Sequence, residues 1–345
     1  MSQIEQLSPR PNIRLWVFNH CIKGITDQID FFVSSCKQEG YFVTVSRQPC
    51  KNSLNVIVEG LCEKRIGIIT GFCREARKKI AVIMTEHFDY TGGKLLVHGI
   101  QSDYIADGEL ALRARMLADS KELTKSFLTM GDLPKLQSIG QYLPSIPLKR
   151  IPFPKLEFTR TEEREEQGDF RQELVFTGTM TKHRAHVLDA VRSEGLPIYH
   201  PGRMLSQKKK DKLNKEAKIV VNIPQNETWR WLSPMRIFAA LRMGRATVSL
   251  GTADNSMISN CTLQLNPRDE NWLKTLRGCC ADWRDMYAEA HQSYSEMAAT
   301  YKKENGFPHE LFNDWGNEEG VASTLHASSF WHNQLAGITF KILRW

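Results

Sequence analysis

The sequence lacks any long run of apolar residues. No stretch within its 345 residues approaches the roughly 18 consecutive apolar residues that a membrane-spanning helix requires. Its first residues, MSQIEQLSPRPN, also lack the apolar centre of a secretory signal. We therefore expect a cytoplasmic protein, and we leave open a peripheral contact with the inner face of the membrane.

Patterns that bind metal ions are also missing. The eight cysteines form no CxxC pair and show no Cys/His spacing typical of a zinc site. No Asp-x-Asp motif is present that could hold a divalent ion beside a phosphate. We expect reduced thiols, no metal and no cofactor.

Length and charge narrow the class of protein. At 345 residues the chain exceeds the size at which a single hydrophobic core usually stops growing, so two domains are expected. Hydrophobic residues make up 41% and charged residues 25% of the chain, which is typical of a globular protein. The formal net charge of +7 favours an anionic partner, whether substrate, membrane surface or nucleic acid.

The first half of the chain alternates short apolar runs with helical patterns. The runs are continuously apolar, as in strands that are buried on both faces of a parallel sheet. The predicted strands are 13–18, 41–46, 55–58 and 80–84, and the predicted helices are 26–39, 63–79 and 108–130.

A proline-rich passage and an acidic polar stretch, TRTEEREEQGD, then predict a linker over 151–172, between domains 1–150 and 173–345. The second domain repeats the alternation and ends in a largely helical tail. Its predicted strands are 174–176, 198–199, 219–223 and 246–250, with helices after Thr181 and Ser233. The expected fold is α/β, with two Rossmann-like, doubly wound domains facing a cleft at the carboxyl ends of their strands.

One cation stands at the start of an apolar helix. Ser233 is a suitable N-cap, Pro234 fits the first helical position, and Gly244 ends the helix. Arg236 then lies in the first turn, at the positive end of the helix dipole. A bound phosphate or carboxylate would make this placement favourable. The alternative is that Arg236 pairs with a carboxylate from elsewhere in the fold.

The turn FTGTMTKHR is a second candidate for anion binding. Gly178 permits close backbone approach, Thr179 offers a hydroxyl, and His183 and Arg184 enter the first turn of a helix. In the alternative interpretation, Gly178 only makes a turn and both basic side chains face solvent.

Further candidates lie before the Ser233 helix. Together, Arg230 and Arg236 can clamp a diphosphate without a metal ion. Asn222 follows a predicted strand and either contacts a ligand or fixes a loop. Trp229 and Trp231 either stack on a base or sugar or anchor their loop to a core.

The order of these features over residues 174–251 resembles the C-terminal, donor-binding domain of GT-B glycosyltransferases. Within that clan it is similar to the group-1 and CgeB-like sets, which act in polysaccharide and glycoconjugate synthesis. The resemblance implies sugar transfer from a nucleotide sugar to a saccharide, lipid-linked or protein acceptor. It also implies that domain 1–150 binds the acceptor. The donor-binding residues would be Gly178, Thr179, His183, Arg184, Asn222, Arg230, Ser233 and Arg236.

The chain departs from the family pattern in one respect. Many retaining members carry a pair of glutamates at the start of this helix and within it, but no acidic residue lies between Glu227 and Asp254 here. We therefore expect an inverting, metal-independent reaction in which arginines stabilise the departing diphosphate.

An inverting reaction needs a general base from the first domain. Glu86 directly follows predicted strand 80–84, and His20 follows the first strand. These two residues are the leading candidates, with His87 and Asp27 as secondary choices.

The run SQKKKDKLNKEAK, residues 206–218, is a basic helical face. It is either solvated surface or a contact for an anionic membrane or a lipid-linked acceptor. We expect no nucleic-acid partner, because aromatic residues are not interleaved in the run. The alternatives for the whole chain are a nucleotide-sugar epimerase or phosphorylase on the same scaffold, and a basic nucleic-acid-binding protein.

Overall fold

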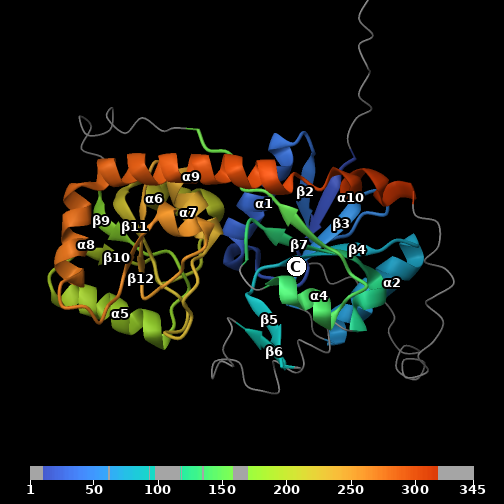
Figure 1. Cartoon of the computed structure of the whole chain (residues 1–345), viewed down its shortest axis with the longest axis horizontal. Helices are drawn as coiled ribbons and strands as arrows, with labels where there is room; N and C mark the ends of the chain where they lie inside the picture. Colours follow the sequence, from blue (N-terminus) through green and yellow to red (C-terminus); the bar gives the residue numbers. More distant parts are fainter. Residues whose placement is uncertain are drawn as a thin grey trace, which may run out of the picture.

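The computed structural model describes residues 11–60, 63–92, 94–97, 117, 119–133, 136–157 and 170–317. Each half of the chain builds one parallel β-sheet covered by helices, and the two halves lie side by side (Figure 1).

The first sheet has six parallel strands in the order β2-β1-β3-β4-β7-β8. Every residue of β3 and β4 is buried, which explains why both are continuously apolar or nearly so. An antiparallel hairpin, β5–β6, projects from this half (Figure 1). The strands are β1 (Ile13–Trp16), β2 (Val43–Ser46), β3 (Leu54–Val58), β4 (Ile80–Met84), β5 (Phe88–Thr91), β6 (Lys94–Val97), β7 (Thr124–Met130) and β8 (Leu148–Ile151), and the helices are α1 (Thr26–Gln38), α2 (Glu63–Ala76) and α4 (Ile139–Tyr142).

The second sheet has five parallel strands in the order β10-β9-β11-β12-β13. Thr181 caps the helix after β9, because its hydroxyl accepts from the Arg184 amide at 3.3 Å. The strands are β9 (Gln172–Val175), β10 (Ile198–Tyr199), β11 (Ala217–Asn222), β12 (Thr247–Leu250) and β13 (Leu263–Leu265), and the helices are α5 (Lys182–Ser193), α6 (Gln207–Lys215), α7 (Pro234–Leu241) and α8 (Trp272–Ala281).

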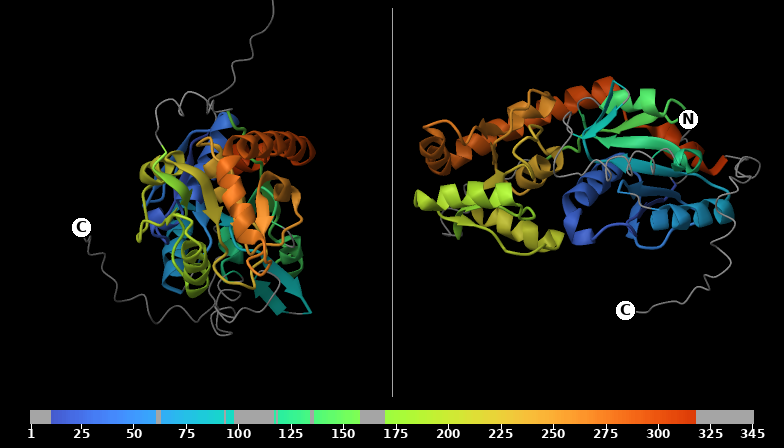
Figure 2. Two further views of the ribbon diagram at one scale, coloured as in Figure 1. Left: turned by 90° about the vertical axis from the view of Figure 1, so that its left-hand side faces the viewer. Right: turned by 90° about the horizontal axis from the view of Figure 1, so that it is seen from below.

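The helical tail connects the two halves. Helix α9 (Trp283–Asn305) begins beside the second sheet and runs along both halves to the first, where α10 (His309–Asn313) follows (Figures 1 and 2). The Tyr294 and Tyr301 hydroxyls donate to the carbonyl oxygens of Pro154 at 3.1 Å and Gly131 at 2.9 Å. Beyond α10, the Trp315 indole donates to the carbonyl oxygen of Lys79 at 3.2 Å. The apolar end of the chain lies outside the described residues.

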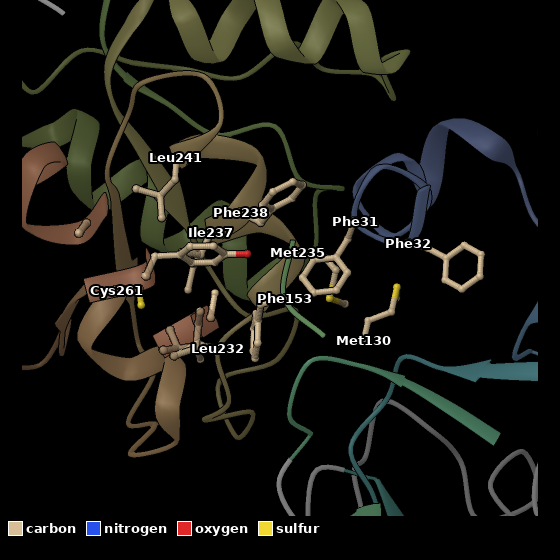
Figure 3. Close-up of a cluster of buried hydrophobic side chains, with 14 of the residues drawn as sticks. Phe31, Phe32, Met130, Phe153, Leu232, Met235, Ile237, Phe238, Leu241 and Cys261 are labelled. Carbon is tan, nitrogen blue, oxygen red and sulfur yellow. The ribbon is translucent and has the colours of Figure 1, made fainter. Parts of the chain in front are cut away.

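An apolar core joins the two halves where α1 packs against α7 (Figure 3). The Phe31 ring of α1 meets the Phe238 ring of α7 edge-on, with centroids 5.6 Å apart, and it meets the Phe153 ring at 5.8 Å. Such aromatic packing at a domain boundary favours one arrangement of the two halves over others.

The structure corrects part of the sequence prediction. Residues Thr124–Met130, predicted as the end of a helix, form β7. The strand lies between β4 and β8, and its Phe127 and Leu128 side chains are both buried. The residues of β7 do not alternate clearly between apolar and polar, so its strand conformation depends on pairing with a neighbour on each edge. The hairpin β5–β6 and strands β8 and β13 were not predicted. Residues 108–116 and 118 of the predicted helix and 158–169 of the predicted linker lie outside the described residues, and the domain boundaries stay a prediction.

Candidate active site

Loops from both halves meet across the domain boundary. His87, just after β4 of the first sheet, stacks on Trp231, just before α7 of the second half, with centroids 5.4 Å apart and an interplanar angle of 11°. Trp229 is buried in the same apolar cluster as Trp16 and Ile57 of the first half. Both tryptophans therefore anchor the β11–α7 loop against the first half.

The turn after β9 approaches α7 closely. A Cβ added to Gly178 would lie 2.5 Å from Phe176 Cζ and 3.4 Å from Arg236 Nη2. Only glycine fits above the buried Phe176 ring without displacing it. The structure thus brings together the two features that the sequence analysis proposed for anion binding.

Arg236 lies in the first turn of α7, and its Nη1 donates to Asn222 Oδ1 at 2.8 Å. Among the described residues it forms no ion pair with a carboxylate. Burial lowers the pKa of Arg236, and the more distant Asp27 opposes this shift. A partly desolvated guanidinium at a helix N-terminus is an environment in which an anion is favourable.

Asn222 and Ser233 shape this arrangement. Asn222 is buried at the end of β11, and its amide nitrogen donates to Ser249 Oγ at 3.3 Å while its oxygen accepts from Arg236. Ser233 is the N-cap of α7 with extended backbone, and its hydroxyl makes no capping bond. Asn222 therefore orients the Arg236 guanidinium.

Arg184 is buried rather than solvent-facing, with 3% of its surface exposed. Its Nε donates to the carbonyl oxygen of Ile223 at 2.9 Å and its Nη1 to that of Thr179 at 2.7 Å. These bonds tie the turn after β9 to the loop after β11. Thr179 contributes its carbonyl oxygen to this tie, and the rest of the residue is exposed.

His183 and Arg230 converge on Gly251, after β12. His183 Nε2 is buried without a hydrogen-bond partner among the described residues, and a Cβ on Gly251 would lie 3.8 Å from it. Arg230 is exposed, and its Nη1 donates to the Gly251 carbonyl oxygen at 3.3 Å. Burial lowers the pKa of His183, while Glu227 opposes that shift, so the imidazole is neutral at neutral pH.

In the first half, a residue that the sequence analysis did not select organises both candidate bases. The Glu59 carbonyl oxygen accepts a hydrogen bond from His20 Nε2. The Glu59 side-chain Oε1 accepts from the backbone amides of Thr85 at 2.8 Å and Glu86 at 2.7 Å. Glu59 directly follows buried strand β3, much as Glu86 follows β4 after Thr85, and this position is the signal that could have identified Glu59.

The secondary candidates have other roles in the structure. The Asp27 carboxylate pairs with Lys210 Nζ at 2.9 Å, and both side chains are buried. Lys210 belongs to the basic run 206–218, so this lysine is an interdomain contact and not part of a solvated face. Its neighbours Lys208 and Lys209 are exposed.

A cavity of about 610 Å³ lies between β10 and α6. His200, between the lining residues Tyr199 and Pro201 in the chain, donates from Nε2 to the carbonyl oxygen of Gly178 at 3.0 Å. None of the predicted donor-binding residues lines it. Its lining includes Tyr199, Arg203, Lys209, Lys212, Leu213 and Glu216.

Within the described ranges, no helix is long and apolar enough to cross a membrane. In the same part of the chain, His, Cys, Asp and Glu side chains form no group of three or more that could hold a metal ion. Metal independence stays a prediction.

No protein-family model matches the sequence, and no curated protein sequence is similar to it. Several solved structures are similar in fold. An α-glucosyltransferase in complex with UDP and a 13-mer DNA has 9% identity and a TM-score of 0.50, with 86% of this chain and 97% of that chain covered. HepE from Anabaena, in complex with UDP and glucose, has 9% identity and a TM-score of 0.49, with 89% and 98% covered. An α1,3-fucosyltransferase has 11% identity and a TM-score of 0.42, with 93% and 94% covered.

The similarity to the α-glucosyltransferase and the two parallel sheets define the class of fold. The chain has the two-domain α/β architecture of GT-B glycosyltransferases, as expected from the sequence. The finer resemblance to the group-1 and CgeB-like sets stays a prediction.

Proposed function

We propose that this chain is a glycosyltransferase that moves a sugar from a nucleotide-activated donor to an acceptor. One observation carries the proposal: Arg236, partly desolvated at the N-terminus of α7 and without a carboxylate partner among the described residues, lies against the Gly178 turn. Helix dipole, guanidinium and close backbone all favour a bound phosphate.

In this proposal the donor diphosphate lies between the Gly178 turn and the start of α7. Arg236 contacts it from one side, and Arg230 and His183 approach from Gly251. The two arginines offset the charge that develops on the leaving diphosphate, so the proposed reaction needs no divalent metal. Asn222 and Arg184 hold these groups in place from behind.

In this proposal the base is Glu86 rather than His20. A carbonyl oxygen only accepts hydrogen bonds, so His20 Nε2, bonded to the Glu59 carbonyl, carries its hydrogen and has no lone pair to offer there. In the proposed inverting step, the acceptor oxygen attacks the anomeric carbon and its proton passes to the Glu86 carboxylate. The bond from the anomeric carbon to the phosphate oxygen breaks, and the diphosphate leaves with the electron pair.

The acceptor would lie against the first half of the molecule and would be a saccharide, a lipid-linked glycan or a protein. Exposed Lys208 and Lys209 on α6 support peripheral contact with an anionic membrane, as the lipid-linked option requires. A role in polysaccharide or glycoconjugate synthesis, in the cytoplasm, is part of this proposal.

Thermal unfolding in the presence of UDP, GDP, dTDP, ADP or CMP tests donor binding. We expect one nucleotide to stabilise the protein by about 2.7 kcal/mol when its concentration exceeds its Kd about a hundredfold. Arg236→Gln should abolish the shift. Arg192→Gln, at an exposed ion pair on α5, is the matched control and should leave the shift intact.

If none of the five nucleotides stabilises the wild type, the transferase proposal is contradicted. If the donor is consumed at the full rate without any acceptor, a nucleotide-sugar epimerase or phosphorylase is favoured instead.

A further inference from the structure

Glu59, at the carboxyl end of β3, has an asymmetric environment. Its side chain is 4% exposed. Oε1 accepts three hydrogen bonds, from the Thr85 amide at 2.8 Å, the Thr85 hydroxyl at 2.5 Å and the Glu86 amide at 2.7 Å. Oε2 is buried and has no hydrogen-bond partner among the described residues.

The burial, and an Oε2 that is unpartnered in the described part of the chain, favour a neutral carboxylic acid over a carboxylate. A buried carboxylate would need donors at both oxygens, and leaving one charged oxygen without a donor is costly. In a neutral acid the carbonyl oxygen accepts hydrogen bonds and the other oxygen carries the hydrogen, and a buried hydroxyl without an acceptor costs less than a charged oxygen without a donor. Oε1 fits the first description and Oε2 the second.

The surrounding charges act in the same direction. Glu86, on the turn after β4, places a like charge beside Glu59, and among the described residues no cation forms an ion pair with Glu59. His20 donates to the Glu59 backbone rather than to its carboxyl group, and Arg65 of α2 donates to the Gly60 carbonyl oxygen. His87, next to Glu86 in the chain, stacks on Trp231. Burial, and then the charge of Glu86, raise the pKa of Glu59 to about 8, against the opposing effect of the bonds from Thr85 and Glu86.

We propose that Glu59 is a positioning residue for the transfer reaction: it remains protonated and uncharged, holds the Thr85–Glu86 turn through Oε1, and leaves the single negative charge of the pair on Glu86. The inference rests on the proposed function for its role in catalysis, but the protonation state can be tested without it. Two carboxylates in one site cannot both ionise easily, so a neutral Glu59 keeps Glu86 available as the proton acceptor.

The same residue ties three loops together. Its carbonyl oxygen accepts from His20 Nε2 and from Asn19 Nδ2 at 3.3 Å, both after β1, and its carboxyl group holds the turn after β4. A change at Glu59 therefore acts on Glu86 through position and charge, without contact with the substrate.

The first test measures the thermal unfolding midpoint between pH 5 and pH 9 for the wild type and Glu59→Gln. Because the pKa of Glu59 is raised in the folded state, its stabilising contribution is present below the unfolded pKa of about 4.5 and is lost as the pH rises through about 8. Glu59→Gln removes this loss. We expect its midpoint, relative to wild type, to rise by several degrees from pH 5 to pH 9.

The matched control is Glu75→Gln, an exposed glutamate in the same half, which should keep the wild-type pH dependence. If Glu59→Gln also parallels the wild type, Glu59 ionises as an ordinary carboxyl group and the proposal is overturned. No ligand is needed, so the result is independent of whether the chain is a transferase.

A second measurement covers the case in which Glu59→Gln does not fold. Carbon-13 labelling of glutamate carboxyl groups, followed by NMR, should show one group of the wild type titrating near pH 8. In Glu86→Gln this group should titrate at lower pH, because the like charge is gone. Absence of any glutamate titration above pH 6 would contradict a protonated Glu59.

Once a donor is found, the pH profile of kcat separates position from charge. With Glu59 neutral, Glu59→Gln leaves the acid limb, set by Glu86, at its wild-type pH. If Glu59 carries the charge instead, its removal moves that limb to lower pH, which would refute the assignment of the charge to Glu86.

Discussion

At the scale of single residues, the candidate site depends on close fits. Gly178 has no room for a side chain between the Phe176 ring and Arg236. His183 leaves a buried nitrogen unbonded within the described part of the chain, and Arg184 uses its donors to join two loops. Even conservative substitutions at these positions should therefore have a large effect on ligand binding.

Gly178→Ala tests the fit at the turn. The new methyl group would meet Phe176 Cζ at 2.5 Å, so the turn and the ring must shift. We expect a loss of about 1–3 kcal/mol in the free energy of unfolding, and loss of the nucleotide-induced thermal shift. Denaturant unfolding and the nucleotide titration measure both effects.

The control is Gly71→Ala on α2, where an added Cβ meets nothing within 4 Å. Helix propensity predicts that this change stabilises by about 0.5–1 kcal/mol. Equal behaviour of the two variants would contradict the steric argument.

At the scale of elements, α1 carries charges that meet α6 and α7 of the other half. Asp27 pairs with Lys210, and Asp30 lies 3.0 Å from Arg242 Nε, which also binds Asp211. Loss of Asp27 and loss of Asp30 should have different effects. Among the described residues, Lys210 has Asp27 as its ion-pair partner, whereas Arg242 keeps Asp211 when Asp30 is lost.

Asp27→Asn should cost about 3–5 kcal/mol, because it leaves the buried Lys210 ammonium without its partner. Asp189→Asn, at an exposed pair on α5, is the comparison and should cost less than about 1 kcal/mol. Urea unfolding at pH 7 measures both. Equal costs would show that the interdomain pair contributes no more than a surface pair.

Asp30→Asn should have a different, pH-dependent effect. Burial is the main cause that raises the pKa of Asp30 to about 6, with Asp211 and Asp27 adding to it and Arg242 opposing. Its stabilising contribution is thus present below the unfolded pKa and is lost as the pH rises through about 6. We expect the unfolding midpoint of Asp30→Asn, measured relative to that of the wild type, to rise between pH 4 and pH 7.5. A constant difference over this range would contradict a raised pKa.

Some helices, strands and site residues could be predicted from the sequence alone, and others could not. Strand β4 was predicted with the observed bounds because its continuous apolar run is a strong local signal. Strand β7 was mistaken for helix, since its pairing with β4 and β8 is not encoded in its own residues. In the site, Glu86 was recognisable by its position after a strand. The position of Glu59 after β3 was a comparable local signal that the sequence analysis did not use. The hydrogen bonds from Glu59 to the Thr85–Glu86 turn and the burial of Arg184 depend on loops that are distant in sequence, so no local pattern identifies these contacts.

At the scale of the whole molecule, the net charge of +7 and the arginines at the domain boundary suit an anionic donor. The two halves each supply one part of the proposed reaction: the second holds the leaving group and the first holds the base. Neither part is complete without the other.

Metal removal tests this division of roles. If arginines alone stabilise the leaving diphosphate, treatment with EDTA should leave donor turnover within about twofold of the untreated enzyme, and Arg236→Gln should reduce kcat by about 10²- to 10³-fold. Strict dependence on added Mg²⁺ or Mn²⁺ would contradict the proposed metal-free clamp.

Helix α9 has a mechanical consequence. The described chain passes between the halves at the segment around Pro154 and again in α9, and the Tyr294 hydroxyl bonds the two crossings directly (Figure 1). Two connections that are bonded to each other restrain the relative position of the halves more than a single connection would. Together with the packing of α1 against α7, they oppose a separation of the two halves, so the arrangement of Glu86 and Arg236 does not depend on a single linker.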